Sequence, residues 1–72
     1  MEQIKDLVQG FVNGFGTGCS KEEMIVKVYR FLCGKDIDCC ILNDKYLEFD
    51  GFIVELIRKR SAGVWVAKII EK

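Results

Sequence analysis

The sequence predicts an α+β domain in which two N-terminal helices pack on one face of a four-stranded antiparallel β-meander, in the order ααββββ. Apolar residues repeat at helical spacing in the N-terminal half of the chain. Apolar and polar residues alternate between residues 46 and 70, and two turn signals, Asp50-Gly51 and the segment 60–63, divide this stretch into three strand-length runs. No linker, repeat or low-complexity segment divides the 72 residues, so we expect a single domain over residues 1–72.

The composition is that of a chain that folds and carries no dominant charge. Half of the residues are hydrophobic, proline is absent, and eleven basic residues balance eleven acidic ones. Such a balance gives no overall attraction to nucleic acid or to an anionic membrane. Lys5 and Asp6 interrupt the first apolar stretch, unlike a signal peptide, and no apolar run is long enough to span a bilayer. We therefore expect a cytoplasmic protein with reduced cysteines and no membrane partner.

Residues 2–13 are expected to form the first helix. The apolar residues recur at i, i+3, i+4, i+7 and i+8 and form one stripe: Ile4, Leu7, Val8, Phe11 and Val12. Asn13-Gly14 is a natural helix end, with Gly14 at the C′ position that favours a left-handed backbone.

A capping box marks the start of the second helix. The Ser20 hydroxyl is expected to accept a hydrogen bond from the Glu23 amide, while the Glu23 carboxylate accepts one from the Ser20 amide. Cys33 and Gly34 end this helix, with Gly34 again expected at C′. Its broad apolar face comprises Met24, Ile25, Val28, Tyr29, Phe31 and Leu32.

Two turns set the register of the last three strands. Asp50-Gly51 predicts a two-residue type I′ turn that places Phe49 opposite Phe52. The loop 60–63, closed by a left-handed Gly63, predicts four more opposed pairs: Val54 and Ile69, Leu56 and Ala67, Arg58 and Trp65, and Glu55 and Lys68. Because strand side chains alternate, the residues predicted to face the helices are Leu47, Phe49, Phe52, Val54, Leu56, Trp65, Ala67 and Ile69.

The first strand is expected from Ile37 to Leu42, and its register has two alternatives. A two-residue loop at Asn43-Asp44 would turn Cys40 and Leu42 toward the core. A three-residue loop would instead turn Ile37, Cys39 and Ile41 toward it, and we favour this register because it buries more apolar surface.

The face of the sheet turned away from the helices is predicted to be an interaction face. Two short helices cannot cover both faces, and an exposed apolar patch of this size is unusual on a small monomer. Its apolar residues lie among charges such as Glu55 and Lys68, which are expected to neutralise each other; they are Tyr46, Ile53, Ile57, Val64, Val66 and Ile70. A second copy of the chain, in a homodimer, is the predicted partner, with another protein as the alternative.

Arg58, Lys59 and Arg60 form the only basic run in the sequence. At the tip of the last hairpin these side chains could contact the phosphates of a nucleic acid, with Trp65 across from Arg58 in position for a cation–π contact. Charges that prevent edge pairing at a solvated tip are the simpler interpretation. The neutral charge balance ranks a nucleic-acid-binding regulator second.

The four cysteines predict no metal site. Cys19, Cys33, Cys39 and Cys40 lack the spacing of paired zinc ligands, and the chain has no histidine. We expect mostly buried, unreactive thiols. Cys19 is the exception, because it precedes a helix N-terminus, where thiols become more reactive.

The segment Gly14-Phe15-Gly16-Thr17-Gly18 ends at a helix N-terminus, a geometry that binds phosphate in other proteins. It follows a helix instead of a strand and has no lysine, so a turn between helices is the simpler interpretation. A small-ligand or thiol-dependent protein that uses Cys19 and this loop is the third hypothesis. With no nucleophile–base pair visible, the sequence predicts a non-enzymatic protein-interaction module without a cofactor, a small regulator or inhibitor that acts by binding.

Overall fold

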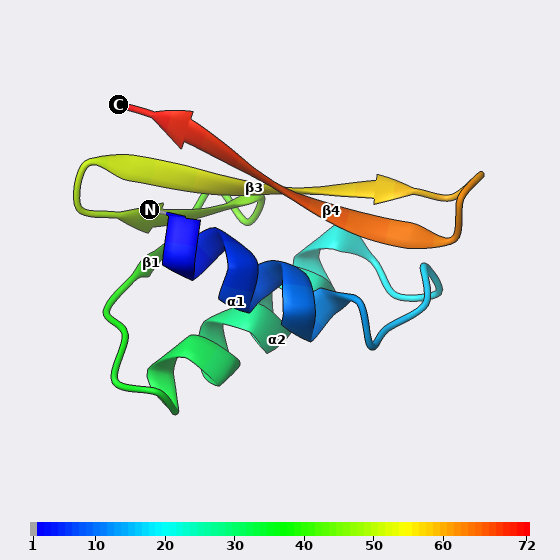
Figure 1. Ribbon diagram of the computed structural model, residues 1–72, viewed down its shortest axis with the longest axis horizontal. Coiled ribbons are helices and arrows are strands. Elements are labelled where there is room, and N and C mark those ends of the chain that lie inside the picture. Colours follow the sequence, from blue (N-terminus) through cyan, green and yellow to red (C-terminus); the bar gives the residue numbers. More distant parts are fainter. Residues whose placement is uncertain (1) are drawn as a thin grey trace.

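The computed structural model describes residues 2–72 and confirms the predicted α+β architecture (Figure 1). The helices and strands are α1 (Glu2–Val12), α2 (Lys21–Cys33), β1 (Cys40–Leu42), β2 (Tyr46–Phe49), β3 (Phe52–Lys59) and β4 (Val64–Glu71). The strands pair in the order β1-β2-β3-β4, as an antiparallel meander. α1 contacts β4, and α2 contacts β1, β2 and β3, so the helix pair covers one face of the sheet.

α1 ends at Val12, one residue before the predicted end. Gly14 does not adopt the left-handed backbone expected of a C′ residue. Its amide donates to the Phe11 carbonyl at 3.3 Å, and the Phe15 amide donates to the Val12 carbonyl at 3.1 Å. The chain therefore leaves the helix through a tightened last turn, which makes the predicted glycine cap unnecessary.

α2 begins at its predicted cap. The Ser20 hydroxyl accepts a hydrogen bond from the Glu23 amide at 3.2 Å. The second bond of the predicted capping box differs, because the Glu23 carboxylate accepts from the Ser20 hydroxyl at 3.3 Å and not from the Ser20 amide. One amide of the first turn is thus satisfied by the cap.

The prediction of Gly34 as the C′ residue of α2 was wrong. Gly34 keeps a right-handed backbone, with φ −66° and ψ −16°, and the left-handed residue is Asp36, with φ 59°. The Asp36 amide donates to the Cys33 carbonyl and the Ile37 amide to the Leu32 carbonyl, the two bonds of a Schellman motif. Leu32 is buried and Ile37 packs against the core, which is the apolar contact that accompanies this motif. This contact sets the chain reversal two residues later than the glycine.

The register of the last three strands is as predicted, with Phe49 opposite Phe52 and Arg58 opposite Trp65. The turn type was wrong. Gly51 has φ 89° but Asp50 is not left-handed, which is the pattern of a type II turn and not of type I′. The register is unchanged because both turn types join the same two opposed residues.

β1 is shorter than predicted: it pairs over Cys40–Leu42 and not from Ile37 onward. Ile41 lies opposite Leu47, which confirms the three-residue loop. The expected burial holds for Ile37 and Cys39, which pack against the core, but not for Ile41, which is 36% exposed on the edge strand. Continued in this register, residues 37 and 38 would lie opposite the Asp50-Gly51 turn, where β2 has already ended. They have no strand to pair with, so β1 starts later.

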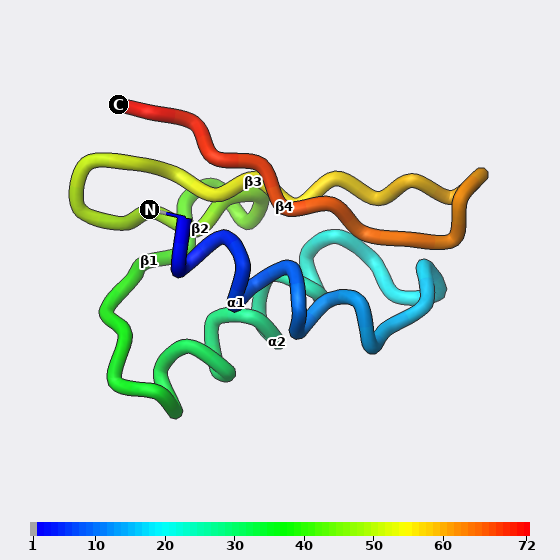
Figure 2. The backbone as a smooth tube through the Cα atoms, in the orientation of Figure 1, coloured from blue at the N-terminus to red at the C-terminus, as the bar shows by residue number. Residues whose placement is uncertain are grey.

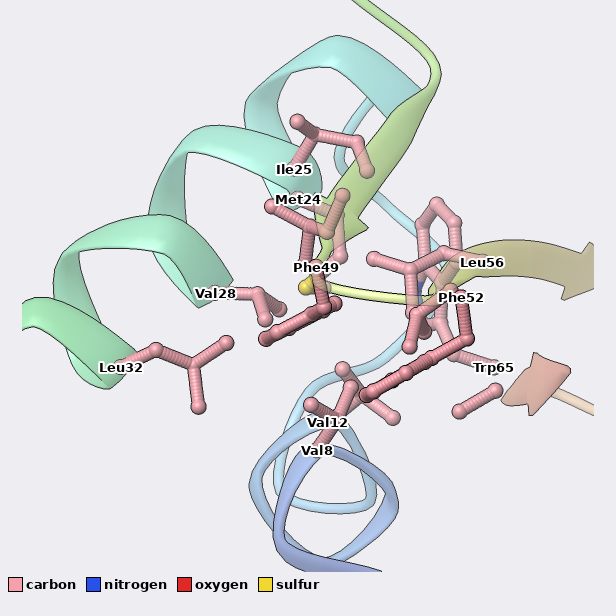
Figure 3. Packing of buried hydrophobic residues seen from close by; sticks show 13 residues of the cluster. Val8, Val12, Met24, Ile25, Val28, Leu32, Phe49, Phe52, Leu56 and Trp65 are labelled. Atoms are coloured by element: carbon pink, nitrogen blue, oxygen red, sulfur yellow. The ribbon is translucent and has the colours of Figure 1, made fainter. Parts of the chain in front are cut away.

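The core lies between the sheet and the two helices (Figure 3). Seven of the eight residues predicted to face the helices are buried, and the eighth, Ile69, is half-buried. Phe49 and Phe52 stack at 4.8 Å between ring centres, next to the turn that joins β2 to β3. The buried residues are Val8, Val12, Met24, Ile25, Val28, Leu32, Leu47, Phe49, Phe52, Val54, Leu56, Trp65 and Ala67.

A side chain of α1 closes part of the open edge of β4. The Gln9 Oε1 atom accepts from the Ala67 amide at 2.8 Å, and the Gln9 Nε2 atom donates to the Trp65 carbonyl at 2.8 Å. A neighbouring strand would make the same pair of bonds, so Gln9 takes the place of a fifth strand at this point.

Candidate interaction face

The outer face is the side of the sheet turned away from the helices. Within residues 2–72, no helix lies over it (Figure 2). The pairing of β3 with β4 arranges its side chains in rows: Ile53 with Ile70, Glu55 with Lys68, Ile57 with Val66, and Lys59 with Val64. The structure therefore brings the predicted residues of β3 and β4 together on one surface, with Tyr46 of β2 next to Glu55.

The apolar side chains of the outer face are less exposed than the sequence suggests. Val64 is 40% exposed, whereas the other five predicted residues are half-buried, because neighbouring side chains on a sheet cover one another. Leu42 of β1 joins the face opposite Tyr46. The sequence did not assign Leu42 because the register of β1 was open.

Charged side chains border and cross the apolar rows of the outer face. Glu55 lies opposite Lys68, as predicted, but it forms its ion pair with Lys21 of α2, at 3.7 Å. The Lys21 Nζ atom also lies 5.8 Å from the centre of the Tyr46 ring. Lys68 is exposed and makes no ion pair within the described chain, so its charge is available to a partner.

A second ion pair lies at the other end of the face. The Lys72 Nζ atom is 3.0 Å from a carboxylate oxygen of Glu48. Both side chains are more than a third exposed, so this pair contributes little to stability. It does keep one acidic and one basic group at the border of the face.

The three residues of the basic run do not point together. Arg58 lies on the helix side of the sheet, where its guanidinium donates to the Cys19 carbonyl at 2.8 Å and its Cζ atom is 5.8 Å from the centre of the Trp65 ring. Lys59 lies opposite Val64 on the outer face, and Arg60 is exposed in the loop. The predicted contact between Arg58 and Trp65 is confirmed, and it holds Arg58 against the protein.

The glycine-rich loop is fixed under the β3–β4 hairpin, where Figure 2 shows residues 14–20 below the end of the sheet. Two side chains of the hairpin bind its carbonyl groups: the Trp65 Nε1 atom donates to Gly16 at 3.2 Å, and Arg58 donates to Cys19. The Cys19 side chain is half-buried and packs against the core. The loop carbonyls thus bind side chains of the β3–β4 hairpin and help to hold the hairpin in place.

The prediction of mostly buried thiols was wrong. Cys33 and Cys40 are exposed, and Cys19 and Cys39 are half-buried, because the cysteines lie at a helix end, in a loop and on a short edge strand. Burial raises the pKa of the Cys39 thiol to about 11, and the nearby Cys33, Cys40 and Asp38 add to this shift. A hydrogen bond with Cys33 raises the pKa of Tyr29 above its ordinary value.

Among residues 2–72, no three side chains of the types that ligate metals are grouped to hold an ion. In the same range, no helix is long and apolar enough to cross a bilayer.

An open hollow of about 440 Å³ lies beside β1. Its lining includes Asp38, Cys39, Cys40, Glu48 and Asp50. The carboxylates give it an acidic character, and Lys72 neutralises Glu48 at its border.

The comparisons with known proteins give one partial similarity. Beta-defensin 126 of Hylobates lar is 40% identical to this chain over 43 residues, which is 60% of this chain and 38% of that protein. The chain thus spans well under half the length of this relative, and the similarity does not assign it to a family. No described protein family matches the chain, and no solved structure matches it.

Proposed function

We propose that this protein is a non-catalytic interaction module, located in the cytoplasm, that forms a homodimer through its outer face. The observation that carries the proposal is the pair of apolar rows, Ile53 with Ile70 and Ile57 with Val66, on a face that no helix of the described chain covers. Full burial of such a side chain stabilises a protein by about 1.5–3 kcal/mol. These side chains are only half-buried in the protomer, so burial of their remaining surface in a dimer would provide the rest of this free energy.

The arrangement of charges favours a second copy over an unrelated partner. A twofold axis that runs along the strands, between β3 and β4, would place each β3 residue over the β4 residue of its own row in the second copy. Ile57 would meet Val66, and Glu55 would meet the exposed Lys68. The face is therefore complementary to itself in both apolar and charged rows.

The protomer does not need its partner to complete its core. Its accessible surface is 4535 Å², close to the roughly 4,600 Å² expected for a folded monomer of this mass. We therefore expect a reversible dimer whose separated protomers stay folded.

Sedimentation equilibrium tests the proposal with the wild type and one double variant of the outer face. The wild type should be dimeric at high micromolar concentration. Ile57→Glu combined with Val66→Glu should be monomeric and retain its circular dichroism spectrum, because four like charges would meet in the interface. A wild type that stays monomeric at high micromolar concentration contradicts self-association.

A matched pair of single variants separates the interface from general surface effects. Val64 on the outer face and Val26 on α2 are both 40% exposed. Val64→Glu should weaken dimerisation, whereas Val26→Glu should leave it unchanged. Equal effects of the two substitutions would argue against the outer face.

The hypothesis of nucleic-acid binding loses one of the three cations on which it was based. Arg58 is bound to the Cys19 carbonyl, which leaves Lys59 and Arg60 as the free cations of the run. A gel-shift assay at low and moderate salt distinguishes the hypotheses, because phosphate contacts weaken steeply as salt increases. We expect no salt-dependent shift.

A further inference from the structure

The segment after α2 folds back over the helix that it has just left. Cys33 is the last residue of α2, and the Schellman motif bonds Ile37 to the carbonyl of Leu32 in the preceding turn. Ile37 and Cys39 both pack against the core, on the helix side of the chain. β1, which starts directly after Cys39, contacts α2. The backbone therefore returns Cys39 toward the end of the helix that carries Cys33.

The neighbouring thiols differ in direction. Cys40 lies opposite Glu48, on the outer face of the sheet, and so points away from α2. Cys39, one residue earlier, points to the helix side. Tyr29 lies one helical turn before Cys33, and the nearby Cys33, Cys39 and Cys40 thiols all raise its pKa. Of the two thiols that follow α2, only Cys39 therefore lies on the helix side of the sheet, separated from Cys33 by five residues of chain.

We propose that Cys33 and Cys39 form a thiol pair that closes to an intramolecular disulfide when the protein meets a low-molecular-weight disulfide. The exposed Cys33 thiolate attacks one sulfur of the reagent, forms a mixed disulfide and releases one small thiol. The Cys39 thiolate then attacks the Cys33 sulfur and releases the second small thiol. Both protein thiols lose their protons, and the two electrons reduce the reagent's disulfide to two thiols.

The environment of Cys39 sets the pH dependence of the second step. Burial is the main cause of its raised pKa, and burial persists after Cys33 has reacted. Since the thiolate is the attacking species, closure should accelerate about tenfold for each pH unit between pH 7 and pH 9. Acidic groups beside Cys39, including Asp38, should also make a cationic reagent more effective than an anionic one.

The experiment starts from the reduced protein and uses cystamine as the oxidant, with oxidised glutathione as the anionic comparison. Acid-quenched mass spectrometry should show a mixed disulfide that converts to a species with two hydrogen atoms fewer than the reduced protein. Peptide mapping should locate the bond between Cys33 and Cys39. A bond from Cys33 to Cys40, or a stable mixed disulfide that never closes, overturns the proposal.

Three serine variants provide the controls. Cys40→Ser and Cys19→Ser should close as the wild type does, whereas Cys39→Ser should stop at the mixed disulfide on Cys33. Cys33 is exposed, so Cys33→Ser should fold and yet fail to form the intramolecular bond. Closure of either Cys33→Ser or Cys39→Ser at the wild-type rate would contradict the assignment.

Discussion

At the scale of single residues, Trp65 connects the two ends of the chain. Its side chain is fully buried, its indole nitrogen binds the Gly16 carbonyl, and its own carbonyl accepts from Gln9. The Arg58 Cζ atom lies 5.8 Å from the centre of this ring, and the guanidinium donates to the Cys19 carbonyl. The sequence predicted the contact between Arg58 and Trp65 because the residues are opposed on a hairpin. It did not reveal Gln9, because that contact depends on where α1 lies along β4.

Gln9→Ala should destabilise the protein by about 1–3 kcal/mol, because it leaves the Ala67 amide and the Trp65 carbonyl without their partner at a partly buried edge. Urea unfolding measures this loss. Gln3 lies on the same helix and is exposed, so Gln3→Ala is the matched control and should change stability by only a few tenths of a kcal/mol. Equal stabilities of the two variants would show that Gln9 does not protect the edge.

The raised pKa of Cys39 predicts a loss of stability at alkaline pH. An unfolded thiol ionises near pH 8.5, roughly, whereas folded Cys39 keeps its proton until about pH 11. Between these values the unfolded state binds fewer protons, so stability decreases as pH rises and the decrease ends above about pH 11. Urea unfolding with reductant, at pH 8 and at pH 10.5, should show a larger decrease for the wild type than for Cys39→Ala. Parallel decreases would mean that Cys39 ionises normally.

At the scale of helices and strands, the sequence correctly predicts those helix starts and strand registers that depend on residues close together in the chain. Ser20 caps the start of α2, as its sequence position predicts. The loop that ends at Gly63 sets the register of β3 against β4, and Gly63 is left-handed as expected, with φ 68°. β1 was predicted too long because its extent depends on where its partner β2 stops. The end of α2 was misplaced for a similar reason: the contact of Ile37 with Leu32, and not the glycine, sets the reversal.

Phe52→Ala should cost about 3–5 kcal/mol, the usual loss for a large buried aromatic side chain. Phe52 is 7% exposed and stacks on Phe49 where β2 turns into β3. Because a domain of this size has little more stability than that, we expect the variant to be largely unfolded by circular dichroism. Ile41→Ala, at a site 36% exposed on the edge strand, should remain folded. A melting temperature of Phe52→Ala within a few degrees of the wild type would contradict the core described above.

At the scale of the whole molecule, the two faces of the sheet differ. One face is covered by helices and holds the buried residues of the core, while the other carries apolar rows with charges between them. The sequence predicted both faces from the alternation of side chains. It did not predict that Lys21 reaches around the sheet to Glu55, because a long side chain from another element makes that contact. Within the described chain, the resulting surface has two free cations beside apolar residues, Lys59 opposite Val64 and Lys68 opposite Glu55.

Isotope-filtered NMR on a mixture of labelled and unlabelled protein shows whether two copies meet through this outer face. Intermolecular nuclear Overhauser effects report which methyl groups of one protomer lie near the other. We predict effects between the methyl groups of Ile57 and Val66, and between those of Ile53 and Ile70, that disappear in the Ile57→Glu and Val66→Glu double variant. Intermolecular effects confined to helix residues such as Val26, or none at high micromolar concentration, would contradict the account.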